Sequence, residues 1–292
     1  MKIGMTLPSM VADYDAATTR SWCRRIDDGP YASVSVGERI TFRNQEQLVL
    51  LAAASALTER VRVVATIVVL PLHPAPLVAK QMATLDVLSA GRLTVGVGVG
   101  GREHDYQAVG ASFDRRLARL DAGVAELRRT WAGQPPFDGA DPVGPLPVQA
   151  GGPPILCSSL GPSSLARAAH WADGLAGFTV GADPSELADT VAKVRGAWVA
   201  AGRSAAPSLM TSAWVSLGPD ADSRHDRYVR DYMAFEPALS GLLADAATIR
   251  SEPAFAAAID AAEAAGFDEF MVVPTTSDLA ELDRMEAVLS RR

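Results

Sequence analysis

The chain has 292 residues, of which 48% are apolar, and carries a formal net charge of −7 at pH 7. An α/β barrel of about 250 residues forms one domain, so the length favours a single domain over residues 1–292. The acidic charge is spread along the chain and disfavours nucleic acid and anionic membranes as partners, because both attract basic surfaces. Two distant cysteines, no signal-peptide pattern and short apolar runs predict a cytoplasmic protein.

Short runs rich in β-branched residues recur along the chain and predict eight strands. They are Lys2–Thr6, Ala32–Gly37, Val61–Val69, Arg92–Val97, Pro154–Ser159, Gly174–Phe178, Ser208–Ser216 and Glu269–Val273. Because several of these runs are apolar throughout, we expect a parallel sheet that is covered on both faces.

Amphipathic segments separate the strands and predict helices. They are Asp13–Ile26, Gln45–Thr58, Ala75–Leu88, Asp114–Trp131, Ser163–Trp171, Pro184–Ala201, Ala221–Ala265 (broken near Ser251) and Leu279–Arg291. Eight strand–helix pairs predict an α/β fold of the (β/α)₈ TIM barrel type. The proline- and glycine-rich segment Ala132–Pro154 predicts an insertion without regular structure after the fourth helix. A doubly wound open sheet is the alternative, although it usually has fewer such pairs.

The stretch RLTVGVGVGGREHDY, Arg92–Tyr106, has G-x-G-x-x-G spacing at Gly96, Gly98 and Gly101. In a dinucleotide-binding fold, a helix opens directly after these glycines. Here a polar loop is expected instead, and helical periodicity resumes near Asp114, which disfavours a Rossmann interpretation. Two interpretations remain. Either the strand end lets a flat ligand approach its backbone, or the glycines relieve crowding inside the barrel.

The segment LPLHPAPLVAKQMATLDVLSAGRLTVGVGVGG, Leu70–Gly101, resembles the signature of the bacterial luciferase-like flavin-dependent oxidoreductase superfamily. The resemblance continues through YQAVGASFDRRLARLDAGVAELRRTW and PPILCSSLGPSSLARAAHWADG. It implies a barrel with an insertion that binds reduced FMN or the deazaflavin coenzyme F420 at the C-terminal ends of its strands. It also implies a non-prolyl cis peptide at Ala65–Thr66 or Thr66–Ile67.

The segment SSLGPSSLARAA, Ser158–Ala169, predicts a site for the cofactor phosphate. Gly161 permits a turn, and Pro162 suits the first position of a helix. The amides and hydroxyls of Ser163 and Ser164 then face an incoming anion at the positive end of that helix. The alternative is a plain serine N-cap. Because the Gly-Pro pair resembles deazaflavin-type members of the superfamily, F420 is favoured over FMN.

Further site candidates lie where the predicted strands end, since barrel enzymes build their sites there. His104 is the candidate acid–base group, because a neutral imidazole transfers protons near pH 7, and Glu38 is the candidate for orienting substrate. The other candidates for cofactor contact are Met5, Gly37, Thr66, Gly98, Ser158 and Ser159. The structural alternatives are an exposed loop position for His104, an arginine ion pair for Glu38 and barrel packing for Met5. We expect no metal site.

The resemblance implies an oxidoreductase that transfers hydride between the reduced cofactor and a small organic substrate, or that activates oxygen with reduced FMN. A homodimer is a possible assembly. Glu38 and Arg39 replace the acid–base pair of deazaflavin-dependent dehydrogenases, so alcohol oxidation is not indicated. The alternatives are a flavin-binding protein without turnover and a non-redox barrel enzyme that acts on a phosphorylated substrate.

Overall fold

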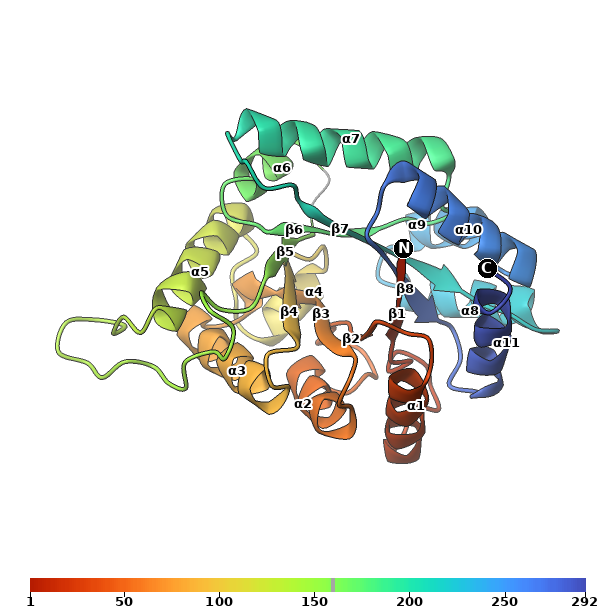
Figure 1. Ribbon diagram of the computed structural model, residues 1–292, viewed down its shortest axis with the longest axis horizontal. Coiled ribbons are helices and arrows are strands. Elements are labelled where there is room, and N and C mark those ends of the chain that lie inside the picture. The colour runs from red at the N-terminus through yellow and green to blue at the C-terminus, as the bar shows by residue number, and fades with distance from the viewer. Residues whose placement is uncertain (159–160) are drawn as a thin grey trace.

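Eight parallel strands close into a barrel in the computed structural model, which describes residues 1–158 and 161–292 (Figure 1). The strands are β1 (Lys2–Thr6), β2 (Ser33–Val36), β3 (Arg62–Val69), β4 (Leu93–Gly98), β5 (Ile155–Cys157), β6 (Gly174–Phe178), β7 (Ser208–Val215) and β8 (Glu269–Pro274). Each strand pairs with the next one in the chain, and β8 closes the barrel on β1. The predicted TIM barrel is confirmed.

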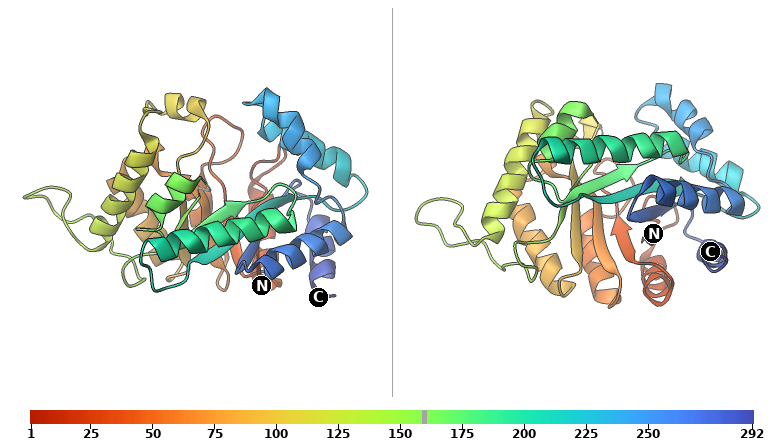
Figure 2. Two further views of the ribbon diagram at one scale, coloured as in Figure 1. Left: turned by 90° about the horizontal axis from the view of Figure 1, so that it is seen from above. Right: turned by 45° about the horizontal axis from the view of Figure 1, so that its top comes forward.

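Helices surround the barrel and cover its outer face (Figure 1). They are α1 (Ala16–Asp28), α2 (Gln47–Leu57), α3 (Ala75–Leu88), α5 (Arg116–Trp131), α6 (Pro162–Ala168), α7 (Pro184–Ala200), α10 (Glu252–Ala265) and α11 (Ala280–Leu289). The 3₁₀ turn η1 (Leu70–Leu72) follows β3, and α4 (Glu103–Ala108), α8 (Ala221–Tyr232) and α9 (Pro237–Ala246) are additional. Figure 2 shows α4 and the α8–α9 pair above the same end of the barrel. No helix in residues 1–158 or 161–292 is long and apolar enough to cross a membrane.

Two expectations about helices were wrong. The segment after β4 was expected to be a polar loop, but it forms α4, in which Asp105 and Tyr106 are buried. Six residues are too few to show helical periodicity. The segment 221–265 has the expected break before Ser251, but a second break separates α8 from α9. Pro237 explains the new start, since proline suits the first turn of a helix.

The insertion lies outside the barrel as expected. Residues 132–154 contain no helix or strand and project away beside α3 and α5 (Figures 1 and 2). Asp86 of α3 is fully buried and anchors this segment, because its carboxylate accepts hydrogen bonds from Gln149 N at 2.9 Å and Gln149 Nε2 at 2.7 Å. The LDVLSAGR part of the signature therefore serves the scaffold.

The glycines of β4 relieve crowding inside the barrel. Strand β3 shifts register against β4 between Ala65 and Val68, and the expected cis peptide is present at Thr66–Ile67. A Cβ atom on Gly96 would lie 2.7 Å from Ala65 O, and one on Gly98 would overlap with Ile67 Cδ1. A Cβ on Gly101 would meet nothing within 4 Å. Packing therefore requires the first two glycines of the spacing and not the third.

Candidate functional site

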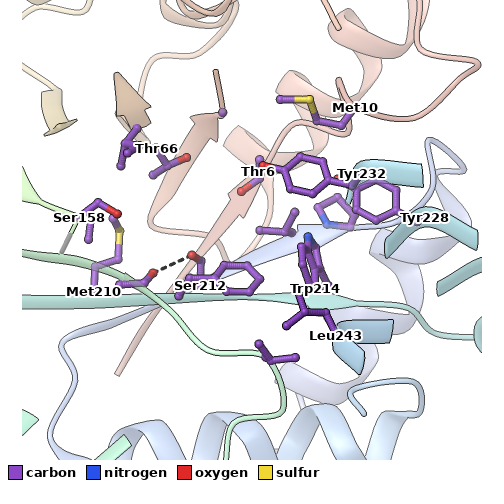
Figure 3. A pocket seen from close by; sticks show the side chains of 18 of the residues that line it. Thr6, Met10, Thr66, Ser158, Met210, Ser212, Trp214, Tyr228, Tyr232 and Leu243 are labelled. Atoms are coloured by element: carbon purple, nitrogen blue, oxygen red, sulfur yellow. Dashed lines mark hydrogen bonds between the residues drawn. The ribbon is translucent and has the colours of Figure 1, made fainter. Parts of the chain in front are cut away.

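A cavity of about 380 Å³ opens at the carboxyl ends of the strands, within the size range of small-molecule sites (Figure 3). Strand ends form its floor, and α8 and α9 form one wall. The lining residues are Thr6, Leu7, Met10, Gly37, Thr66, Ile67, Ser158, Ala176, Gly177, Phe178, Val180, Met210, Ser212, Trp214, Tyr228, Tyr232, Met233, Leu243, Val273 and Pro274. None of these described lining residues is Asp, Glu, His, Lys or Arg, so the pocket is apolar and uncharged.

Small hydroxyl side chains supply the polar groups of the floor. Thr6 Oγ1 lies 2.8 Å from Ser35 Oγ, and Ser212 Oγ donates to Gly177 O at 2.8 Å. Thr66 and Ser158 line the same floor from β3 and the end of β5. These short side chains leave room above the strands and offer hydrogen bonds to the polar edge of a flat ligand.

Aromatic rings form the wall opposite Ser158 (Figure 3). Tyr228 and Tyr232 lie one helical turn apart on α8 and stack with their ring centroids 6.1 Å apart. Trp214 of β7 meets the Tyr232 ring edge-on at 5.8 Å and the Phe178 ring at 4.7 Å. Burial raises the pKa of the Tyr228 phenol far above its ordinary value, so this phenol stays neutral.

His225 of α8 is fully buried behind this wall. Because of this burial, we expect the folded protein to lose stability in acid. The Nε2 atom of His225 lies 3.5 Å from Trp214 O. Burial, helped by the positive charge of Arg250, lowers the pKa of His225 to about 4 from 6.5. In the unfolded chain, His225 therefore binds a proton as the pH falls below 6.5. In the folded chain, it binds that proton only near pH 4. Stability present above pH 6.5 is lost as the pH falls.

We expect wild type to lose about 2 kcal/mol more unfolding free energy than His225→Gln between about pH 7 and about pH 4.5. Urea unfolding of both proteins at the two pH values measures this difference. The other titrating groups are common to both proteins, so their contribution cancels. The same pH dependence in both proteins would contradict a buried neutral His225.

The structure brings three of the predicted cofactor contacts together in the pocket: Gly37, Thr66 and Ser158. Met5 is not brought there. Its side chain is fully buried in the layer between the barrel and the helices, while the next residue, Thr6, lines the pocket. This follows from the alternation of side chains along a strand. Gly98 ends β4 against Ile67 and is not among the lining residues.

Glu38 faces away from the pocket. Its buried carboxylate accepts a hydrogen bond from Val69 N at 2.6 Å and lies 2.7 Å from His73 Nε2. The expected arginine partner of Glu38 was therefore wrong, because its partner is His73. Burial opposes the charge on His73, but the hydrogen bond to Glu38 and its negative charge outweigh this effect and raise the pKa of His73.

His104 is exposed on α4 and lines a second cleft with Thr41, Arg102 and Phe235. It does not line the barrel-end pocket. A role for His104 in proton transfer therefore requires a substrate that extends into this second cleft, and that role stays a prediction.

The predicted phosphate-binding segment starts helix α6 as expected. Gly161 is the N-cap residue, so the serine N-cap alternative was wrong, and no side chain among the described residues caps this helix. Pro162 and Ser163 are exposed and Ser164 is half-buried. Ser158, the first residue of this segment, lines the pocket, whereas residues 161–164 are not among the lining residues. Ser159 lies outside the described residues.

The aromatic wall was missed in the sequence. Trp214, Tyr228, Tyr232, Met233 and Leu243 line the pocket, although α8 and α9 were expected only as part of a covering helix. A signal was present, because Tyr228 and Tyr232 are spaced one turn apart and Trp214 lies near the end of a predicted strand. Nothing in that spacing, however, places α8 over the mouth of the barrel.

Comparison with known proteins identifies the family. The family model for luciferase-like monooxygenases matches residues 1–282, and the chain belongs to this family. A Mycobacterium tuberculosis protein is 34% identical over 157 residues, which are 51% of this chain and 53% of that one. The pyrimidine monooxygenase RutA of Escherichia coli is 30% identical over 176 residues, 55% of this chain and 47% of RutA. The chain thus spans about half the length of these relatives.

Solved structures share the fold over the whole chain. The monooxygenase RslO1 from Streptomyces bottropensis has a TM-score of 0.77 at 23% identity, covering 100% of this chain and 98% of that one. An F420-dependent secondary alcohol dehydrogenase in complex with an F420–acetone adduct has a TM-score of 0.78 at 19% identity, covering 99% and 98%. The oxygenating constituent of 3,6-diketocamphane monooxygenase from Pseudomonas putida was solved in complex with FMN. It has a TM-score of 0.74 at 16% identity, covering 100% of this chain and 97% of that one.

Proposed function

We propose that the chain is a flavin- or deazaflavin-dependent oxidoreductase that acts on a small organic substrate and holds the cofactor ring in the barrel-end pocket. The uncharged lining of that pocket carries this proposal. Its described residues include no carboxylate, imidazole, amine or guanidinium group, which favours a bound organic cofactor as the source of the reactive group. The names of RutA, the alcohol dehydrogenase and the FMN-bound monooxygenase support a redox function.

The pocket residues fit a flat, mostly apolar ring with polar edges. Trp214, Phe178 and Met210 offer large apolar surfaces, and Thr6, Ser158 and Ser212 offer hydroxyls for the ring edge. When bound, the cofactor supplies hydride transfer or, for reduced FMN, the activation of oxygen. The chain binds and orients the ring and the substrate, and the wall of α8 and α9 excludes water from them.

We favour F420 over FMN because of the Gly161–Pro162 pair at the start of α6, and we place the cofactor phosphate at Ser163 and Ser164. No side chain in residues 1–158 or 161–292 caps α6, and this supports the placement, since the first amides of a helix can bind an anion. Glu38, which contacts His73 and not the pocket, becomes a positioning residue for the end of β3.

Replacement of Ser163 by Asp tests this placement. The new carboxylate lies against the cofactor phosphate, but Asp is well tolerated in the first turn of a helix. We expect affinity for the bound cofactor to fall at least tenfold, or about 1.4 kcal/mol, with little change in the melting temperature of the cofactor-free protein. Fluorescence titration with FMN and F420 and thermal melting of both proteins measure these effects.

Riboflavin, which lacks the phosphate, is the matched ligand control for FMN. Its affinity should be the same in wild type and Ser163→Asp. If the variant binds both cofactors as tightly as wild type does, the phosphate lies elsewhere.

A further inference from the structure

Two arginine side chains lie at the mouth of the barrel beside the aromatic wall. Arg39 follows β2, and its Cζ lies 4.3 Å from the Phe42 ring centroid and 5.3 Å from that of Tyr232. Arg102 precedes α4, and its Cζ lies 4.7 Å from the Tyr232 centroid and 4.4 Å from that of Phe235. Both guanidinium groups are therefore held against the same aromatic cluster by cation–π contacts.

Neither arginine has a carboxylate partner in the part of the chain that the structure describes. Arg39 is only 7% exposed, and its guanidinium group makes one hydrogen bond within the described residues, from Nη1 to Tyr232 O at 2.9 Å. The Nε atoms of Arg39 and Arg102 are both buried without a partner. The nearby carboxylates are used elsewhere, because Asp105 accepts from Thr41 N and Asp231 pairs with Arg43.

A buried, unpaired charge is costly unless a counter-charge binds to it. Burial and the positive charge of Arg102 lower the pKa of Arg39, and the negative charges of Asp105 and Asp231 offset this effect only in part. A bound anion would relieve both effects. Guanidinium groups offer planar pairs of donors that suit the two oxygens of a carboxylate or phosphate.

A cleft gives an anion access to Arg102, whereas the nearly buried Arg39 is not among the residues that line it. The cleft has a volume of about 230 Å³ and is lined by Thr41, Gly101, Arg102, Glu103, His104, Phe113, Phe235 and Glu236. The carboxylates of Glu103 and Glu236 are exposed to solvent, and neither forms an ion pair with Arg102 within the described residues. Solvent screens such exposed charges, so they do not replace a directly bound anion.

Tyr232 connects this pair to the barrel-end pocket, because its ring lines the pocket and contacts both guanidinium groups. Figure 3 shows Tyr232 at the end of the pocket opposite Ser158. We propose that Arg102, with the positive charge of Arg39 beside the same aromatic ring, binds the carboxylate or phosphate group of the substrate, whose apolar body lies in the pocket. The assignment of the anion to a substrate rests on the proposed function, but the anion site itself does not.

Replacement of Arg102 by Met tests the proposal on the cofactor-free protein. The Arg102 side chain makes no hydrogen bond or ion pair among the described residues, so Met should preserve the fold and the aromatic packing. We expect inorganic phosphate or succinate, at constant ionic strength, to raise the melting temperature of wild type. We expect calorimetric affinity for the better probe to fall at least tenfold in Arg102→Met.

Arg20→Met is the matched control, because Arg20 is exposed on α1 and outside the cluster, and it should respond as wild type does. Arg39→Met removes the second guanidinium group. Phosphate or succinate should therefore also fail to raise the melting temperature of this variant. If neither probe binds wild type, or if Arg102→Met binds the probes equally well, the anion site is refuted.

Flavin titrations distinguish the source of the anion. We expect Arg102→Met to leave the ratio of FMN to riboflavin affinity unchanged, because the substrate and not the cofactor carries the anion. A tenfold loss for FMN alone would overturn the assignment to substrate. If wild type binds phosphate or succinate but neither FMN nor F420, the proposed function fails while the anion site stands.

Discussion

Ser212→Phe is expected to weaken binding of the preferred cofactor at least a hundredfold, or about 2.7 kcal/mol. Ser212 lies on the floor of the pocket, and its side chain is half-buried. A phenyl group there would take up space that the cofactor ring needs. Because the new ring points into an existing cavity, it does not have to displace the core. Fluorescence titration with FMN and F420 measures the loss, and thermal melting checks the fold.

Ser212→Ala is the matched control, since it removes the hydrogen bond to Gly177 O without adding volume. It should keep cofactor affinity within about threefold of wild type, or about 0.6 kcal/mol. If Ser212→Phe folds and binds the cofactor as well as Ser212→Ala does, the ring does not occupy this pocket.

Gly96→Ala is expected to destabilise the protein by about 3 kcal/mol, because the new methyl meets a backbone oxygen. The oxygen belongs to Ala65, which is held by strand pairing between β3 and β4. Gly98→Ala should cost only about 1 kcal/mol, because the end of the Ile67 side chain can rotate away. Gly101→Ala should change stability by less than about 0.5 kcal/mol. Urea unfolding of the three variants measures this order.

Gly101→Ala is the control for the set, since its new Cβ meets nothing within 4 Å. Equal losses at all three positions would contradict the packing explanation. They would favour a role of the whole glycine spacing in binding a ligand against the backbone.

The barrel could be predicted because the sequence pattern that produces it is local and repeats along the chain. Eight short apolar runs separated by amphipathic segments fit parallel strands that helices cover, and few other folds use so many such pairs. The strand ends Gly37, Thr66 and Ser158 line the pocket for the same reason, since the barrel gathers these ends at one face. The side-chain direction at Met5 could not be assigned, because a shift of one residue reverses the face that a side chain meets.

The wall of the pocket could not be predicted, because its contacts join distant segments. Tyr232 of α8 meets Arg39 after β2 and Arg102 after β4, and no spacing within α8 reveals either partner. Helix α4 is too short to show a period, and tertiary hydrogen bonds such as Thr41 N to Asp105 hold it in place. Such elements are defined by packing and not by local propensity.

Separate titrations of the purified chain with F420 and FMN test the central claim most directly. The proposed function predicts saturable binding of at least one of them, one molecule per chain, with a Kd below about 10 µM, or about −7 kcal/mol. Tighter binding of F420 than of FMN is the expected order. Failure of both cofactors to bind at concentrations a hundredfold higher would contradict the claim. Binding of simple phosphate esters in that case would favour a barrel enzyme without redox chemistry.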